Sequence, residues 1–256
     1  FFVSINDSIV SGEKLNAGAW VVFLIGLGFL TWVTWIVIKK LHERNLTWLS
    51  VAVGFLILLG VRMIMVYGSF PDLRGETPIF DPRQFASSTF NNSIGNLLLN
   101  TATLFLVSLL TFAFYKSPSF SYWKNKRPLP KLLCSTALFL LFFASQLLPF
   151  LYLETIYHNS VITPDIARQL SFNSVRSFAL GCIILSTLTG IVFSLTFFKL
   201  AVRINVKNQI AYFSSALIAA IVFYLYHVFT DRNYEVPFIL TIVNLGALIY
   251  SSLNRK

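Results

Sequence analysis

The sequence has few charged residues, and no acidic residue lies in the middle of its long apolar segments. Charged residues make up 12% of the 256 residues and hydrophobic residues make up 56%. A water-soluble domain of this size would not easily cover such a chain with polar surface. Because proton- and cation-coupled transporters often hold a carboxylate at depth in the membrane, the missing acidic residues weigh against that class.

The motifs of common catalytic chemistry are missing as well. The sequence has no Walker-type phosphate loop, dinucleotide-binding glycine pattern, zinc-protease motif or nucleophile elbow. The only cysteines, Cys134 and Cys182, lie toward opposite faces of the membrane, and bridged Cα atoms must be within about 7 Å, so no disulfide is expected. An external pair of His158 and His227 stays open as a metal or pH-sensing site. We assign no catalytic residue, no metal and no cofactor.

Long apolar runs fill most of the chain. Each reaches or approaches the roughly 20 residues that a helix needs to cross a bilayer. Unpaired backbone groups are very costly in the bilayer core, so these segments should be α-helices. The sequence predicts an all-α, polytopic membrane helix bundle, a single transmembrane domain over residues 1–256. The seven expected spans are residues 17–38, 46–67, 94–115, 131–153, 173–200, 209–229 and 237–253.

Basic residues concentrate in alternate gaps between these spans. By the positive-inside rule, the gaps that carry them face the cytoplasm, with the N-terminus outside and the C-terminus cytoplasmic. The formal net charge is +10, but the basic residues flank spans and form no single stripe, which favours membrane lipids with anionic headgroups over nucleic acid as partners. The residues on the cytoplasmic side are Lys39, Lys40, Arg44, Lys116, Lys124, Lys126, Arg127, Lys131, Lys199, Arg203, Lys207, Arg255 and Lys256.

The chain begins with Phe1 and shows no cleavable signal peptide. We interpret it as a fragment of a longer protein. An external N-terminus would then need a signal sequence or another span upstream, and a soluble module would fit after the cytoplasmic C-terminus.

The longest gap, residues 68–93, lies on the external side. Its three prolines prevent a long helix, and its phenylalanines should anchor it at the membrane interface. Two interpretations stay open, a structured interfacial lid and a sensor loop that contacts a ligand. The residues concerned are Pro71, Pro78, Pro82, Phe70, Phe80, Phe85 and Phe90.

Arg62 is the one charge well inside a span. It either snorkels to the outer interface or is buried, and a buried guanidinium needs an acceptor such as a carboxylate of the adjoining loop. Four amide side chains in the spans are interpreted as forming hydrogen bonds between helices. They belong to Asn96, Asn100, Gln146 and Asn244. The candidate ligand or sensing residues are Arg62, Asp72, Asp81, Arg83, Asn96 and Asn100.

One stretch of the chain carries a recognisable pattern. An arginine-bearing span is followed by an external Phe-Asp-Pro segment with Ala-Ser-Ser, and then by a Leu-rich helix that begins Gly-Asn-Leu-Leu-Leu-Asn. This pattern resembles the membrane-embedded region of sensor histidine kinases from the Bacteroidota, and residues 165–199 show a second, less specific similarity. The matching residues of the first stretch are Arg62, Phe80, Asp81, Pro82, Ala86, Ser87, Ser88, Gly95, Asn96, Leu97, Leu98, Leu99 and Asn100.

The resemblance implies a sensory or signal-transmitting module of a two-component system in the bacterial inner membrane. It also implies a homodimer formed through a cytoplasmic kinase region, although these residues hold neither a phosphoacceptor helix nor an ATP-binding domain. A transporter or channel subunit and a structural subunit of a membrane complex are the alternatives. A polar path through the bundle would favour transport, whereas a dry interior packed with phenylalanine would favour sensing or scaffolding.

Overall fold

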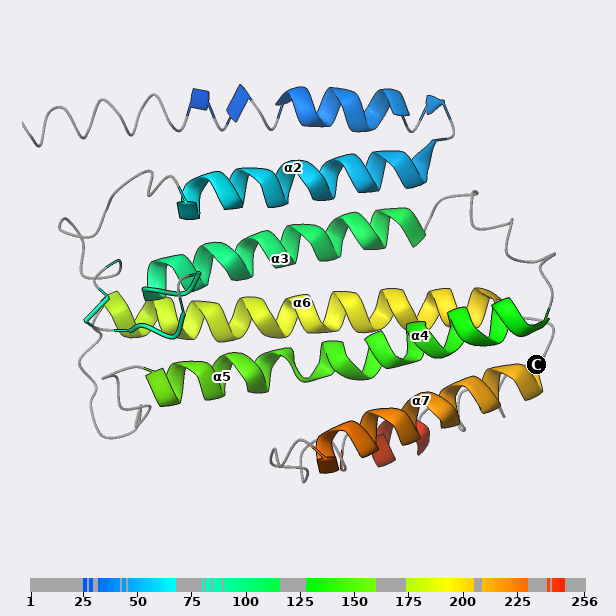
Figure 1. Cartoon of the computed structure of the whole chain (residues 1–256). Helices are drawn as coiled ribbons and strands as arrows, with labels where there is room; N and C mark the ends of the chain where they lie inside the picture. Colours follow the sequence, from blue (N-terminus) through cyan, green and yellow to red (C-terminus); the bar gives the residue numbers. More distant parts are fainter. Residues whose placement is uncertain are drawn as a thin grey trace, which may run out of the picture. The chain divides into compact units, whose positions relative to one another are not determined.

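Six labelled helices dominate the computed structural model (Figure 1). They are α2 (Thr47–Tyr67), α3 (Ile94–Tyr115), α4 (Pro128–Gln146), α5 (Leu148–Asn159), α6 (Ser174–Ile204) and α7 (Gln209–Phe229). Five of the helices in the described part of the chain, α2, α3, α4, α6 and α7, are long and apolar enough to cross a membrane. The chain is therefore a multi-pass, all-helical membrane protein. The structure describes residues 25–26, 28–29, 32–41, 43–44, 46–67, 80, 82–83, 85–88, 90–115, 128–159, 174–204, 209–229, 239 and 241–246.

These five helices correspond to the second through sixth expected spans. The first and last expected spans are described only in part, with helical residues 25–26, 28–29 and 32–38 in the first and 239 and 241–246 in the last. The count of seven spans stays a prediction.

The chain divides into two compact units, Phe1–Thr77 and Pro78–Lys256. The first contains helical residues 32–41 and α2. The second contains all the other labelled helices, and α6 is its central element, since it packs against α3, α4 and α5, while α7 packs against α4.

Within the second unit, α3 and α6 run in the same direction. Ile94 and Val175, near the two N-terminal ends, belong to one buried cluster, and Arg203 near the end of α6 bonds to Tyr115 at the end of α3. The opposite direction is taken by α4, α5 and α7. At about 1.5 Å per residue, the 31 residues of α6 extend roughly 46 Å, well beyond a bilayer core of about 30 Å.

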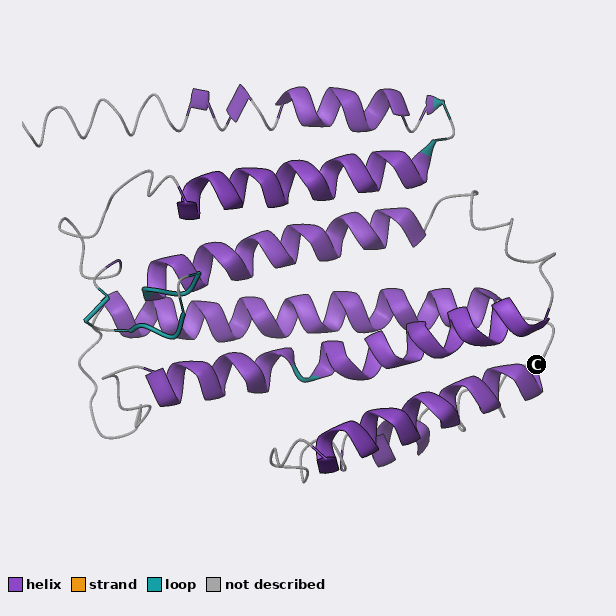
Figure 2. Ribbon diagram, viewed as in Figure 1, coloured by secondary structure: helices purple, strands orange, loops and turns teal. Residues whose placement is uncertain are grey.

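The expected fourth span is not one continuous helix. It breaks between α4 and α5 and continues to Asn159, beyond the expected end at residue 153 (Figure 2). Pro149 has no N–H group, so the carbonyl oxygen of Ser145 loses the donor that a regular helix would supply. At the break, the Leu147 N–H donates to the Ala144 carbonyl oxygen, three residues back, at 3.1 Å.

The break in α4–α5 faces a glycine of α6. A Cβ added at Gly190 would lie 2.7 Å from the Ser145 carbonyl oxygen and 3.7 Å from Cδ of Pro149. Only glycine allows the two backbones to approach this closely. The Ser145 and Ser194 hydroxyl groups hydrogen-bond at 2.7 Å beside this contact.

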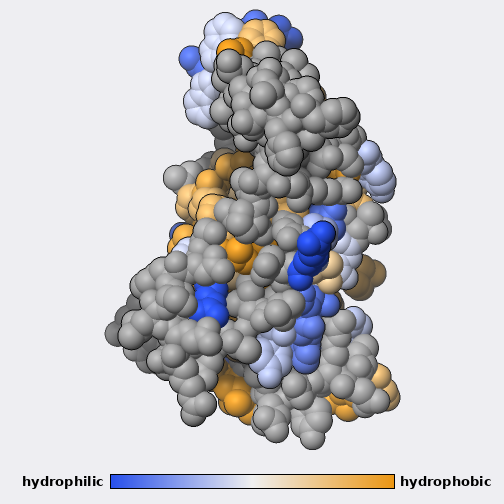
Figure 3. Space-filling model, turned by 90° about the vertical axis from the view of Figure 1, so that its left-hand side faces the viewer, coloured by the Kyte–Doolittle hydropathy of each residue, from blue (hydrophilic) through white to orange (hydrophobic). Residues whose placement is uncertain are grey.

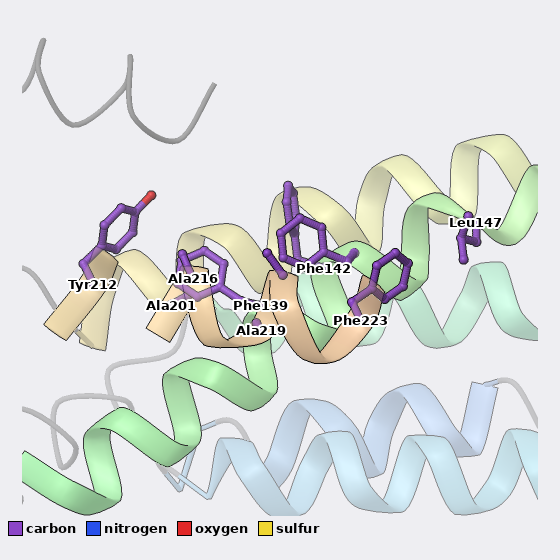
Figure 4. Close-up of a cluster of buried hydrophobic side chains, with 10 residues drawn as sticks. Phe139, Phe142, Leu147, Ala201, Tyr212, Ala216, Ala219 and Phe223 are labelled. Carbon is purple, nitrogen blue, oxygen red and sulfur yellow. The ribbon is translucent and has the colours of Figure 1, made fainter. Parts of the chain in front are cut away.

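The largest buried cluster lies between α4 and α7 (Figure 4). The rings of Phe139 and Tyr212 meet edge to face at 5.3 Å, and those of Phe143 and Phe223 stack at 5.6 Å. Three fully or nearly fully buried alanines of α7 leave room for these rings. The alanines are Ala216, Ala219 and Ala220.

Candidate functional site

The residues that precede α3 pack into the second unit. We call the described residues 80, 82–83, 85–88 and 90–93 the pre-α3 segment. Phe85 is 1% exposed and belongs to a cluster that also holds Ile94, Ile156 and Val175, from α3, α5 and α6. A Cβ added at Gly95 would lie 2.5 to 2.7 Å from ring atoms of Phe80. Phe80 and Phe85 thus fix the segment against the helices of the protein. For Phe85 this corrects the expectation of an anchor at the membrane interface, because its ring is buried among three helices.

A serine and an asparagine shape the start of α3. The Ser93 hydroxyl accepts the N–H of Asn96 at 3.2 Å, which is the geometry of an N-cap. The Asn96 side-chain amide donates back to the same hydroxyl at 3.1 Å and to the side-chain oxygen of Asn92 at 2.5 Å. These bonds satisfy donors at the helix start and hold the chain that enters it.

The side chain of Asn100 stabilises the turn that precedes α3. Its side-chain amide donates to the Phe90 carbonyl oxygen at 3.0 Å and to the Asn91 side-chain oxygen at 2.6 Å. Asn91 itself closes a turn, since its N–H donates to the Ser88 carbonyl oxygen at 3.0 Å. The amide of Asn100 therefore reaches back along α3 to a turn about ten residues earlier in the chain.

A hydrogen bond and buried apolar contacts also tie this region to α5 and α6. The Ala86 N–H donates to the carbonyl oxygen of Asn159, the last residue of α5, at 3.3 Å. Below the cap, the fully buried Cys182 of α6 belongs to the same cluster as Leu97 of α3 and Ile156 of α5. The pre-α3 segment and three helices thus form one connected structure, which we call the loop end of the second unit.

The candidate residues predicted from the sequence fall into three groups. Asn96 and Asn100 lie together at the loop end, and Arg83 lies in an exposed turn of the pre-α3 segment. Arg62 belongs to α2 in the first unit and is 8% exposed. This low exposure favours a buried guanidinium over one that snorkels to the outer interface. Asp72 and Asp81 lie outside the described residues.

Sequence analysis missed several partners at the loop end. Serine is a favoured N-cap residue, so Ser93 immediately before the apolar run that begins at Ile94 is a signal that would have found the cap. The contact between Phe80 and Gly95 and the turn from Ser88 to Asn91 had no such signal.

The expected hydrogen bond between helices is confirmed for Gln146 and Asn244. The Gln146 amide donates to the Asn244 oxygen at 3.2 Å, and the Asn244 amide donates to the Gln146 oxygen at 2.5 Å. Asn244 belongs to helical residues 241–246, so this pair joins the last expected span to α4 next to its break. Cys134 and Cys182 are both free thiols, as expected.

The side chains of the loop end are amides, hydroxyls and aromatic rings. Among the described residues, no three His, Cys, Asp or Glu side chains gather into a group that would hold a metal. Figure 3 faces the side of the molecule that carries the loop end, and its coloured residues include hydrophilic and hydrophobic ones. Amides and hydroxyls can form hydrogen bonds with a ligand, and aromatic rings can pack against apolar groups.

Comparison of the chain with protein-family models, with curated proteins and with solved structures finds no match. The function is therefore inferred from the geometry of the described residues together with the resemblance in sequence.

Proposed function

We propose that the chain is a membrane-embedded module that senses or transmits a signal. The observation that carries this proposal is the burial of Phe85 among α3, α5 and α6. Because Phe85 belongs to a segment that adjoins the helices and is not part of them, displacing that segment changes the packing of three helices at once. A ligand that binds the segment in one packing arrangement better than in another shifts the balance between them.

The helices that receive the change reach the opposite end of the unit. The longest helix, α6, is continuous from Ser174 to Ile204, and Arg203 bonds to the last residue of α3 at 2.7 Å. A movement at the loop end is thus carried by an unbroken helix to a second point of contact with α3.

The interior supports signalling over transport. Phenylalanine rings fill the cluster between α4 and α7, and many buried hydroxyl groups donate to carbonyl oxygens of their own helices. Thr101 and Thr196, for example, donate to residues four positions earlier at 2.7 Å. In the described helices, these hydroxyls satisfy their donors within their own helix, which suits a packed interior.

The full proposal follows the resemblance in sequence. It comprises seven spans, an external N-terminus and a cytoplasmic C-terminus in a bacterial inner membrane, and coupling to a dimeric histidine kinase. The loop end then faces outward and receives the input.

A native thiol offers a direct test. Cys134 packs beside Leu200 and Ile204, at the end of the unit opposite to Phe85. Cys182 is fully buried in the Phe85 cluster and is therefore kept, and we would measure the rate of maleimide labelling of Cys134 in lipid nanodiscs by mass spectrometry of its peptide. Phe85→Ala is expected to change that rate about fivefold, because a shift of about 1 kcal/mol in packing corresponds to that factor. Phe90→Ala is the matched control, since Phe90 is 41% exposed in the same segment.

Equal labelling rates in folded Phe85→Ala and Phe90→Ala protein would exclude signal transmission and leave a structural subunit. The kinase part has its own test, which is ATP-dependent phosphorylation of histidine in the natural protein. Absence of that phosphorylation would refute the coupling to a kinase while leaving the thiol experiment intact.

A further inference from the structure

A seven-residue repeat marks the sides of α3 and α6 that meet. On α3 it leads from Ile94 to Tyr115, and on α6 it leads from Val175 to Arg203. A spacing of seven residues returns to nearly the same side of a helix, so each set lies on one face. Both ends are in contact, through the buried cluster that holds Ile94 and Val175 and through the bond that Arg203 donates to α3. The members between these ends are Thr101, Ser108, Cys182, Thr189 and Thr196.

Small side chains occupy the middle of this interface, and their hydroxyl groups bond within their own helices. Ser108, Thr189 and Thr196 are each 0% exposed, and α3 packs mainly against α6. The three hydroxyls donate to carbonyl oxygens three or four residues earlier in the same helix, each at 2.7 Å. Within the described part of the chain, none of the three bonds to the opposite helix. A small shift of α3 along α6 therefore breaks no hydrogen bond at these positions.

The contact between α4 and α7 is of a different kind. The buried hydroxyls of Ser135 and Ser215 bond to each other across it at 2.8 Å. Beside them, the rings of Phe139 and Tyr212 meet edge to face at 5.3 Å. A shift between these helices would break the bond and separate the rings. The interface of α3 with α6 is thus the easier of the two for the sliding of packed helices that many switches use.

Two cations of α6 hold the C-terminal end of α3. Arg203 donates to the carbonyl oxygen of Tyr115, the last residue of α3, at 2.7 Å and lies over the Tyr115 ring at 5.9 Å. The Lys199 ammonium group lies 5.8 Å from the ring centroid of Phe112 and 5.7 Å from that of Tyr115. The last carbonyl groups of a helix have no partner within it, and cations stabilise them. These contacts fix one position of α3 along α6.

We propose that Arg203 and Lys199 form a latch, which holds α3 and α6 in one of two relative positions until a signal at the loop end opens it. The pre-α3 segment continues directly into α3, so its displacement acts on the helix that the latch holds. When the latch opens, Tyr115 moves away from Leu200 and Ile204, against which it packs. The inference rests on the proposed function for its input.

Cys134 reports the opening, because it packs against Leu200 and Ile204 as Tyr115 does. We would measure the rate at which iodoacetamide modifies Cys134 in the full chain in lipid nanodiscs, by mass spectrometry of its peptide. Rates are compared in the alkaline range where they no longer rise with pH, so that a change in the acidity of the thiol does not count. Modification proceeds from the open form, and its rate follows the population of that form.

Two substitutions weaken the latch and a third is their control. Arg203→Gln loses a hydrogen bond from a charged donor and is expected to raise the rate about tenfold, and Phe112→Leu loses one contact between a cation and a ring and should raise it about threefold. The control is Phe105→Leu. Phe105 is half-buried like Phe112, lies seven residues earlier in α3 and has no cation over its ring among the described residues. Its rate should stay within about twofold of that of the unchanged protein.

A faster reaction in both latch variants and not in the control supports the latch, and any other pattern in folded protein overturns it. Phe85→Ala separates the latch from its input. Added to Arg203→Gln, it should change the rate by less than about twofold, because the latch is already open, and a full additional effect would refute the latch as the step that follows the input. If Phe85→Ala alone changes the rate and the latch variants do not, the latch fails and the proposed function stands. If the latch variants change the rate and Phe85→Ala does not, the latch stands and the proposed function fails.

Discussion

Replacing Gly190 by alanine tests the close approach of α4–α5 to α6. In an isolated helix this change would stabilise, because glycine is less favourable than alanine by about 1 kcal/mol. Here the new Cβ would lie 2.7 Å from the Ser145 carbonyl oxygen, closer than side chains pack in real proteins. The neighbour is backbone, so the helices must separate to admit the methyl group.

The magnitude follows from two opposing terms. Overpacking of a tight interior costs about 1–3 kcal/mol, and we take about 2 kcal/mol for a contact with backbone. Subtracting the gain of about 1 kcal/mol in helix propensity leaves a net loss of about 1 kcal/mol in the free energy of unfolding.

A matched control lies in the same helix. A Cβ at Gly181 would meet only Cδ1 of Leu98 at 4.0 Å, an ordinary contact. Gly181→Ala should therefore stabilise by up to about 1 kcal/mol, and the two variants should differ by about 2 kcal/mol. Unfolding by sodium dodecyl sulfate in mixed micelles measures both. If Gly190→Ala unfolds at the same or a higher detergent fraction than Gly181→Ala, the close approach does not exist as described.

Two other contacts give further predictions. Replacing Gln146 and Asn244 by leucine, singly and together, should give a coupling free energy of about 0.6 to 2 kcal/mol in the same unfolding assay, and strict additivity would contradict the amide pair. Gly95→Ala should destabilise by about 1 kcal/mol because its Cβ displaces the Phe80 ring, and Phe80→Leu added to it should recover part of that loss. A double variant no more stable than Gly95→Ala alone would place the strain elsewhere.

The positions of the long helices follow from the sequence because the interactions that form a membrane-spanning helix lie within the segment itself. A run of about 20 apolar residues satisfies its own backbone and needs no partner to be assigned. The same reasoning identified Gln146 and Asn244, since an amide in an apolar span needs a hydrogen-bonding partner. The sequence does not reveal which two amides meet, because that depends on how the helices pack.

Other features depend on contacts between distant residues. The helix after the break extends past Glu154 to Asn159, where the apolar run has already ended, because Ile156 is buried at 6% exposure in the Phe85 cluster. The turn held by Asn100 depends on a bond across nine or ten residues, which no periodic pattern encodes.

The break beside Pro149 and the continuity of α6 have different mechanical consequences. The pre-α3 segment touches α5 through the bond from Ala86 to Asn159 and touches α6 through the Phe85 cluster. A helix interrupted in the membrane bends at its interruption, so movement of α5 need not carry α4 with it. An unbroken helix moves as a unit. Gly190, the residue of α6 that faces the break in α4–α5, lies near the midpoint of α6. Movement at the loop end is therefore expected to reach Cys134 through Leu200 and Ile204 of α6, and not along the chain of α4 itself.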